Sequence, residues 1–156
     1  MKGNDKVLKF LNESLKAELT AINQYFLHSS VCKNWGYERM AKTQRDEAIS
    51  EMKHAEALMD RILFLEGTPN MTDMFPIKIG SNIKQQLEND LALEMHAIPQ
   101  LNEGIKESTA VGDNASRELF EKILVDEEEH VDYLEGQLYM IKEMGFELYL
   151  SQQMHE

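Results

Sequence analysis

The sequence predicts an all-α fold, a four-helix bundle with a long crossover between its second and third helices and a short fifth helix after the fourth. Three observations predict it. Apolar residues recur at steps of three and four along four long stretches, which is helical spacing. Only three prolines and eight glycines occur among 156 residues, so few positions break long helices. Two of the connections are short and the middle one is long, as in one variant of this bundle.

The expected helices end at turns that contain glycine. Gly36, Gly67, Gly112 and Gly145 each follow one of the four long stretches. Residues 68–82 hold two prolines and no sustained periodicity, and their length suits a crossover that travels along the bundle. The chain length favours a single domain over residues 1–156. Within it, the expected helices cover residues 5–35, 38–66, 82–111, 114–144 and 146–154.

Composition argues against several classes of partner. The formal net charge is −12 and no Lys/Arg-rich tail occurs, so the surface should repel nucleic acid. No segment approaches about 18 uninterrupted apolar residues, and the N-terminal stretch lacks the apolar run of a signal peptide, so no membrane association is expected. The single cysteine, Cys32, rules out an intrachain disulfide and a thiolate metal cluster, and it fits a reducing compartment. We therefore expect a cytoplasmic protein.

Each of the four long stretches carries one glutamate on its apolar seam. In the first stretch, for example, Glu18 stands between Leu15 and Ile22. Ionised carboxylates are almost never buried unless they are paired or bound to a cation, because their desolvation is costly. Four carboxylates on four inward seams therefore require a cation. These seam glutamates are Glu18, Glu51, Glu94 and Glu127.

Two of the seam glutamates belong to a Glu-x-x-His motif, Glu51 with His54 and Glu127 with His130. A spacing of three residues places both side chains on one face of a helix. One glutamate from each of two helices, plus Glu-x-x-His from each of the other two, is typical of ferritin-like di-iron or di-manganese proteins. Carboxylates can balance the charge of two such ions and bridge them, whereas zinc usually takes fewer ligands with more nitrogen or sulfur. The pattern predicts a two-metal centre.

The sequence also holds one tyrosine on the Glu18 seam and three histidines outside the Glu-x-x-His motifs. Tyr25 lies two turns after Glu18 on the same seam, where it either contacts a ligand carboxylate or serves as a core tyrosine, and it is kept among the candidate catalytic residues. His28, His96 and His155 have no partner at ligand spacing. We interpret these histidines as surface or structural residues.

Seven stretches spread along the chain carry a family resemblance. They are MKGNDKV at the start, AINQYFLH (21–28), EMKHA (51–55), RILFLEG (61–67), DLALE (90–94), DEEEH (126–130) and YLEGQL (133–138). In these stretches and in their order, the chain resembles the bacterioferritins. The resemblance implies a cage of 24 subunits that oxidises Fe(II) with dioxygen or hydrogen peroxide and stores ferric mineral. It also implies that the four seam glutamates and the two motif histidines are ferroxidase ligands, with Glu51 and Glu127 bridging the two irons.

The resemblance further implies a haem b between the Met52 residues of two subunits, on a two-fold axis, where it assists electron transfer for iron release. Met52 lies with Ile49, Met59 and Leu63 on a second apolar stripe of its helix, off the Glu51 seam, so this helix should also bury against a neighbouring subunit. For any one of the ten methionines, spacing alone favours a packing role.

The chain departs from the family pattern at several positions. Asp46 and Ser50 stand where many bacterioferritins have His and Asp, which leaves an accessory iron site on the inner surface open. Thr68 replaces an apolar residue that helps to dock a reducing ferredoxin, the redox partner that the resemblance implies. Leu148 and Ser151 replace polar residues common at the four-fold axis, so the pore there should differ in polarity.

Iron storage with ferroxidase activity is the leading hypothesis, and three alternatives accompany it. A rubrerythrin-like peroxidase or an oxygenase would use the same two-metal pattern, although the sequence has no CxxC pair for a rubredoxin iron. A DNA-coating mini-ferritin conflicts with the acidic charge. A haem-binding electron carrier with a vestigial metal site would keep Met52 and make no use of Glu127 or His130.

Overall fold

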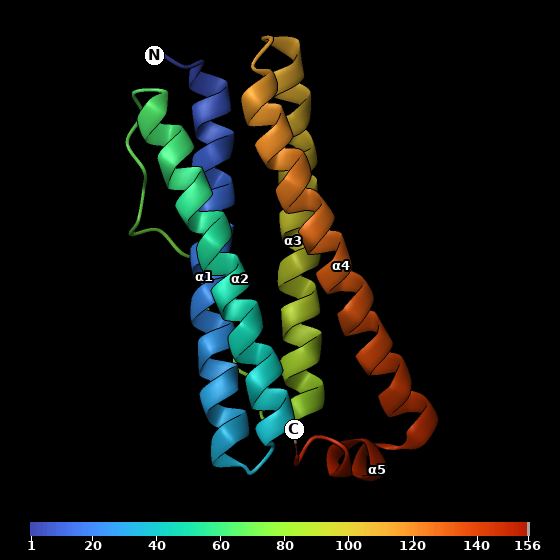
Figure 1. Cartoon of the computed structure of the whole chain (residues 1–156). Coiled ribbons are helices and arrows are strands. Elements are labelled where there is room, and N and C mark those ends of the chain that lie inside the picture. The colour runs from blue at the N-terminus through green and yellow to red at the C-terminus, as the bar shows by residue number, and fades with distance from the viewer. Residues whose placement is uncertain (156) are drawn as a thin grey trace.

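The computed structural model describes residues 1–155 and is built from helices. Figure 1 shows α1 beside α2 and α3 beside α4, with the short α5 lying across the lower end of the bundle. The predicted fold class, an all-α four-helix bundle with a short C-terminal helix, is confirmed. The helices are α1 (Asp5–Asn34), α2 (Glu38–Phe64), α3 (Ile83–Ala110), α4 (Asn114–Met144) and α5 (Phe146–Ser151).

The connection between α2 and α3 runs back along the bundle, so these two helices point in the same direction (Figure 1). Hydrogen bonds between its backbone and side chains of α1 attach it to that helix, beginning at Asn12, which bonds to Thr68 and Asn70. The Phe75 N–H donates to Thr20 Oγ1 over 2.9 Å, and the Lys78 N–H donates to Gln24 Oε1 over 3.2 Å. The crossover predicted for residues 68–82 is therefore anchored by polar side chains of α1 rather than left loose.

Capping side chains explain where three of the helices begin. The Asn4 carboxamide accepts hydrogen bonds from the backbone N–H groups of the first turn of α1. The Asn82 side chain accepts from Gln85 N–H over 2.9 Å, which makes Asn82 the cap and starts α3 one residue later than expected. The Asp113 carboxylate accepts from Ser116 N–H over 3.1 Å at the start of α4.

Four helices end before the expected residue, α1 and α3 by one residue each and α2 and α5 by two and three. Helix α2 ends at Phe64 rather than residue 66, because Glu66 takes a positive φ of 62° and the Gly67 N–H then donates back to Ile62 O over 2.9 Å. Helix α5 ends at Ser151 rather than residue 154. The chain turns there, and the Arg39 N–H donates to Gln153 O over 3.0 Å, which ties the tail to the start of α2.

The core consists of two main apolar clusters at different levels of the bundle. The first includes Leu11, Leu15, Leu58, Ile62 and Phe120. The second includes Cys32, Met40, Leu87, Leu134 and Tyr149. In each long helix the seam glutamate lies in the sequence between residues of the two clusters, so the middle of the bundle is polar. None of the helices within residues 1–155 is long and apolar enough to cross a membrane.

Candidate metal centre

The structure brings the six predicted ligands together in the middle of the bundle. They form two overlapping groups, and within each group one ligand atom per residue lies within 4.8 Å of all the others. Glu51 and Glu127 belong to both groups. The first group is Glu18, Glu51, His54 and Glu127, and the second is Glu51, Glu94, Glu127 and His130.

All four long helices contribute to this centre. Helices α1 and α3 supply one glutamate each, and α2 and α4 each supply a Glu-x-x-His pair on one face. The four glutamates are only 1–3% exposed, although each could be ionised. Because the apolar seams bury whatever residue interrupts them, the periodicity that forms the helices also places the carboxylates inside.

The two histidines face the carboxylates in the same way. His54 Nδ1 lies 3.2 Å from Glu127 Oε1 and 3.5 Å from oxygens of both Glu18 and Glu51. His130 Nδ1 lies 3.4 Å from Glu127 Oε2 and 3.5 Å from Glu51 Oε1. Each imidazole therefore meets the two shared glutamates and one glutamate of its own, which for His130 is Glu94 at 3.7 Å.

Several buried atoms of the centre lack a hydrogen-bond partner among residues 1–155. They include both carboxylate oxygens of Glu127, one oxygen each of Glu18 and Glu51, and Nδ1 of both histidines. Buried polar atoms almost always have a partner, so a cluster of unpaired oxygen and nitrogen atoms points to a ligand. The donor set, with four carboxylates and two imidazoles, suits two divalent ions of the iron or manganese type.

Burial and neighbouring charges shift the pKa values of the glutamates in different directions. Burial raises the pKa of Glu18, and the charge of Glu127 raises it further. Burial also raises the pKa of Glu51 well above its ordinary value. Burial acts on Glu127 in the same direction, but its contacts with His130 and His54 prevail and lower its pKa to about 2. Of these three glutamates, Glu127 therefore holds its negative charge most firmly.

The same contacts raise the pKa values of the histidines. Burial lowers the pKa of His130, but its contacts with Glu127 and Glu47 outweigh burial and raise it to about 11. The pKa of His54 is raised for the same reason, by Glu127, Glu18 and Glu51 against burial. Without metal, both imidazoles hold a proton at neutral pH, and these protons partly balance the buried carboxylates.

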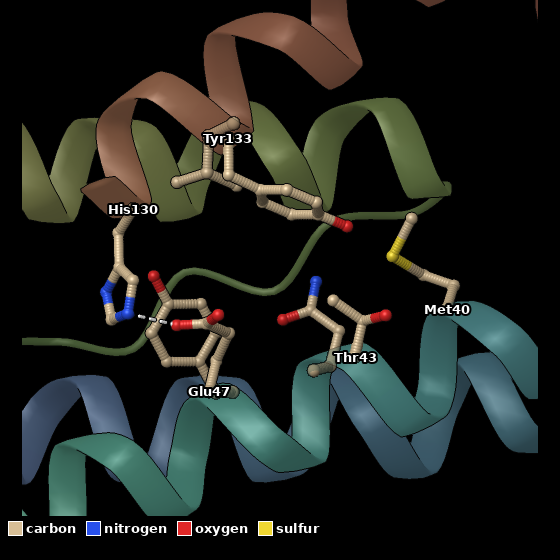
Figure 2. A pocket seen from close by; sticks show the side chains of 8 residues that line it. Met40, Thr43, Glu47, His130 and Tyr133 are labelled. Carbon is tan, nitrogen blue, oxygen red and sulfur yellow. Dashed lines mark ion pairs between the residues drawn. The ribbon is translucent and has the colours of Figure 1, made fainter. Parts of the chain in front are cut away.

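Two carboxylates outside the predicted set hold the outer nitrogens of the histidines. His54 Nε2 lies 2.7 Å from Asp126 Oδ2, and His130 Nε2 forms an ion pair with Glu47, drawn as a dashed line in Figure 2. A carboxylate that binds Nε2 orients the imidazole ring so that Nδ1 points to the centre. The sequence pattern predicts neither residue, because each contacts a histidine of another helix and no spacing within its own helix marks this role.

Tyr25 combines the two roles that the sequence left open. Its ring is 1% exposed and packs beside Ala21 and Ala48, as a core residue would. Its hydroxyl also donates a hydrogen bond to Glu94 Oε1 over 2.7 Å. Burial, and then the charge of Asp90, raise the pKa of Tyr25 well above its ordinary value. The phenol therefore keeps its proton and can serve as a donor to a glutamate of the centre.

A small cavity of about 10 Å³ lies beside His130, with room for about one water molecule. Figure 2 shows the Tyr133 ring reaching from α4 toward Thr43 and Met40 of α2, on the side away from His130. The lining residues are Tyr25, Met40, Thr43, Gln44, Glu47, His130, Tyr133 and Leu134.

The remaining sequence candidates lie away from the centre. Met52 is 47% exposed on α2. His28 is fully buried, His96 meets the edge of Phe75 with ring centroids 4.9 Å apart, and His155 is exposed. Within the described residues, none of these three histidines belongs to the two groups of the metal centre.

Comparison with known proteins agrees with this architecture. A family model described as a ferritin-like domain matches residues 8–144, a range that contains all six residues of the centre. A bacterioferritin of Mycolicibacterium paratuberculosis is 47% identical over 152 residues, covering 97% of this chain and 96% of the relative. The chain belongs to the bacterioferritin family.

Relatives from other bacterial groups match this bacterioferritin-family chain to a similar extent. A bacterioferritin of Streptomyces coelicolor is 47% identical over 151 residues, covering 97% of the chain and 90% of the relative. A bacterioferritin of Brucella melitensis is 45% identical over 149 residues, covering 96% and 92%. The family predicted from the seven sequence stretches is thus confirmed over almost the whole chain.

Proposed function

We propose that this chain is an iron-storage protein that oxidises Fe(II) to Fe(III) at the buried centre. The observation that carries the proposal is the pair of four-residue groups that share Glu51 and Glu127. Membership of the bacterioferritin family supports it, since the relatives bear that name. Two substrate ions would bind side by side, each with one histidine and one glutamate of its own and with the two shared glutamates between them.

The charges of the centre favour oxidation of bound iron. Four carboxylates balance the four positive charges of two Fe(II) ions. Hard anionic oxygens stabilise Fe(III) more than Fe(II), which makes loss of an electron from each ion favourable. The two electrons reduce dioxygen to peroxide, or one hydrogen peroxide to water. Tyr25 would hold Glu94 in place through its hydrogen bond, and Glu47 and Asp126 would hold the two imidazoles.

The proposal extends to a cage of 24 chains with haem b between paired subunits. Met52 fits the role of axial ligand, because its thioether is 47% exposed and a second chain could cover it across a two-fold axis. Leu63 on the same helix is 60% exposed, which also suits an interface. When bound, haem would supply electrons for release of stored iron, and a reducing ferredoxin would be their source.

An accessory iron site on the inner surface receives less support. Asp46 forms an exposed ion pair with Lys42 over 3.0 Å, and Ser50 offers a hydroxyl where a carboxylate would bind better. We therefore restrict the proposed oxidation chemistry to the buried centre.

The proposal is tested by anaerobic Fe(II) titration of the apoprotein, followed by mixing with dioxygen or hydrogen peroxide. Saturation near two Fe(II) per chain and rapid oxidation are expected. Glu127→Ala or His130→Ala should abolish rapid oxidation while haem content stays unchanged. Unaltered function in both variants would instead favour the electron carrier. In parallel, light scattering should give a mass near 24 times the chain mass of 18.0 kDa, whereas a monomer or dimer would contradict the cage.

A further inference from the structure

A second buried polar cluster lies outside the metal centre and is built around Asp90 of α3. Asp90 is 0% exposed. Its Oδ1 accepts a hydrogen bond from Gln24 Nε2 over 2.8 Å and lies 3.0 Å from His28 Nδ1, both on α1. Its Oδ2 accepts from Gln44 Nε2 of α2 over 3.0 Å. One carboxyl group thus joins three helices in a region closed to solvent, and we call these four residues the Asp90 cluster.

The Asp90 cluster and the metal centre share the interface between α1 and α3. Gln24 directly precedes Tyr25 on α1, and Asp90 lies one turn before Glu94 on α3. The Gln24 to Asp90 bond and the Tyr25 to Glu94 bond are therefore neighbouring links between the same two helices. A shift of α1 along α3 that broke the first bond would also move the Tyr25 hydroxyl away from Glu94.

The cluster reaches the other side of the centre through α2. The Gln44 side chain lines the small cavity beside His130, together with Glu47, which forms the ion pair with His130. Gln44 and Glu47 are three residues apart and lie on one face of α2. Asp90 therefore holds the part of α2 that carries the outer partner of His130, as well as the part of α1 that carries Tyr25.

We propose that Asp90 is a positioning residue for iron oxidation, whose carboxyl group fixes α1 and α2 against α3 and so keeps the Tyr25 hydroxyl on Glu94. This inference rests on the proposed function. Buried hydrogen bonds between helices, such as those of Asp90 with Gln24 and Gln44, fix one arrangement of the helices, whereas apolar contacts tolerate sliding. All four members of the cluster are at most 3% exposed, so water cannot replace a lost bond without entering the core.

The bonds of Gln24 dictate which substitutions should be tolerated. Its Oε1 accepts from the Lys78 N–H of the crossover, so its Nε2 must face Asp90. In Asp90→Asn, the remaining oxygen can accept from Gln24 while the new amide donates to Gln44, whose own amide can rotate to offer its oxygen. In Asp90→Leu, of similar size, both bonds are lost. The asparagine variant is thus a conservative rescue and the leucine variant a removal.

The test compares Fe(II) oxidation rates and Co(II) binding to the apoprotein in the assembled full-length chain. Asp90→Leu should slow oxidation and weaken Co(II) binding by about 10- to 100-fold, as loss of an outer partner does at metal sites, with the number of Co(II) bound unchanged. Asp90→Asn should recover most of the oxidation rate and most of the Co(II) affinity. The matched control is Gln86→Leu, at a buried amide one turn earlier on α3 whose side chain, within residues 1–155, bonds only to Cys32. This control should leave the oxidation rate and the Co(II) affinity near their wild-type values.

A double-variant comparison separates positioning from general destabilisation. If Asp90 acts through Tyr25, the double variant Tyr25→Phe/Asp90→Leu should oxidise Fe(II) almost as fast as Tyr25→Phe alone. A rate reduction in the double variant equal to the product of the two single reductions would overturn the inference. Should Asp90→Leu fail to fold, Gln24→Met replaces it in the same comparison. It removes the Gln24 bond to Asp90 and the bond from the Lys78 N–H, and it keeps the Gln44 bond to Asp90. Wild-type rates in Asp90→Leu or in Gln24→Met would also overturn it. Absence of saturable Fe(II) oxidation in the wild-type chain would instead overturn the proposed function.

Discussion

At the scale of single residues, the centre is a balance between buried acids and protonated histidines. Glu127 touches both imidazoles and keeps its charge, with a pKa lowered to about 2. His130 keeps a proton against burial, with a pKa raised to about 11. A divalent ion that enters must take the place of this proton, because Nδ1 cannot bind a proton and a metal at once. Metal and protons therefore compete for the same atoms.

Metal binding should release protons and strengthen as pH rises. The histidine pKa values are raised in the metal-free protein, so both rings are protonated at pH 7 and lose a proton when the ion binds. The apparent Co(II) affinity should increase by about tenfold per pH unit for each proton released. A pH-indicator dye in weakly buffered solution measures the release. Affinity that is constant between pH 6 and 8, with no proton release, would contradict these charge states.

Substitution of a shared glutamate should weaken the binding of two ions, and substitution of an unshared glutamate should weaken the binding of one. Glu127→Gln should lower the affinity for both ions, because Glu127 belongs to both groups. Glu18→Gln should weaken only the ion beside His54 and leave about one tightly bound Co(II) per chain, since loss of one ligand typically costs several kcal/mol at one position. Glu128→Gln, at the exposed neighbouring position, is the control. Equal stoichiometry in the Glu18 and Glu127 variants would argue against bridging.

At the scale of helices, the apolar periodicity predicted the four long helices and the six candidate ligands, but not every side chain that contacts those ligands. The four seam glutamates were predictable because each interrupts an apolar pattern. Boundaries differed by one to three residues where a cap such as Asn82 or the positive φ of Glu66 decides them. Asp90, Asp126 and Glu47 could not be assigned their roles, because their partners lie on other helices and depend on how the helices pack.

The close approach of α3 to α4 at Gly104 should be visible in stability. A Cβ at Gly104 would lie 2.8 Å from the Phe120 ring in the first core cluster. Gly104→Ala should therefore destabilise the chain by about 1–3 kcal/mol, the usual cost of overpacking. Gly136→Ala on α4 is the matched control, since nothing lies within 4 Å of its added Cβ. It should stabilise by roughly 0.5–1 kcal/mol. Denaturant unfolding measures the free energy of unfolding of each variant. Equal changes in this free energy for the two variants would contradict the close contact at Gly104.

At the scale of the whole molecule, the bundle separates a sealed polar centre from an apolar outer face on α2. The net charge of −12 draws cations toward the protein, while Met52 and Leu63 remain exposed on one chain. Exposed apolar residues on a helix that also builds the centre suit burial by a second copy. The cage and the haem are predicted from family resemblance alone, because an interface between copies leaves only a weak pattern in one sequence.

Haem binding should depend on Met52 without affecting the metal centre. Met52→Leu keeps an apolar side chain of similar volume but removes the thioether, so haem absorbance per chain should fall close to zero. The mass of the assembly and the Fe(II) oxidation rate should stay within about twofold, because Met52 lies outside both ligand groups. Met95→Leu, at a methionine 54% exposed on α3, is the control. Full haem content in Met52→Leu would exclude Met52 as the ligand.

We propose that two metal ions share Glu51 and Glu127 inside one chain. Anomalous diffraction at the iron edge, from crystals soaked anaerobically in Fe(II), would locate these ions. Two peaks are expected within each bundle, one beside Nδ1 of His54 and one beside Nδ1 of His130, with the two shared carboxylates between them. A single peak, or iron bound only at the surface of the bundle, would contradict it.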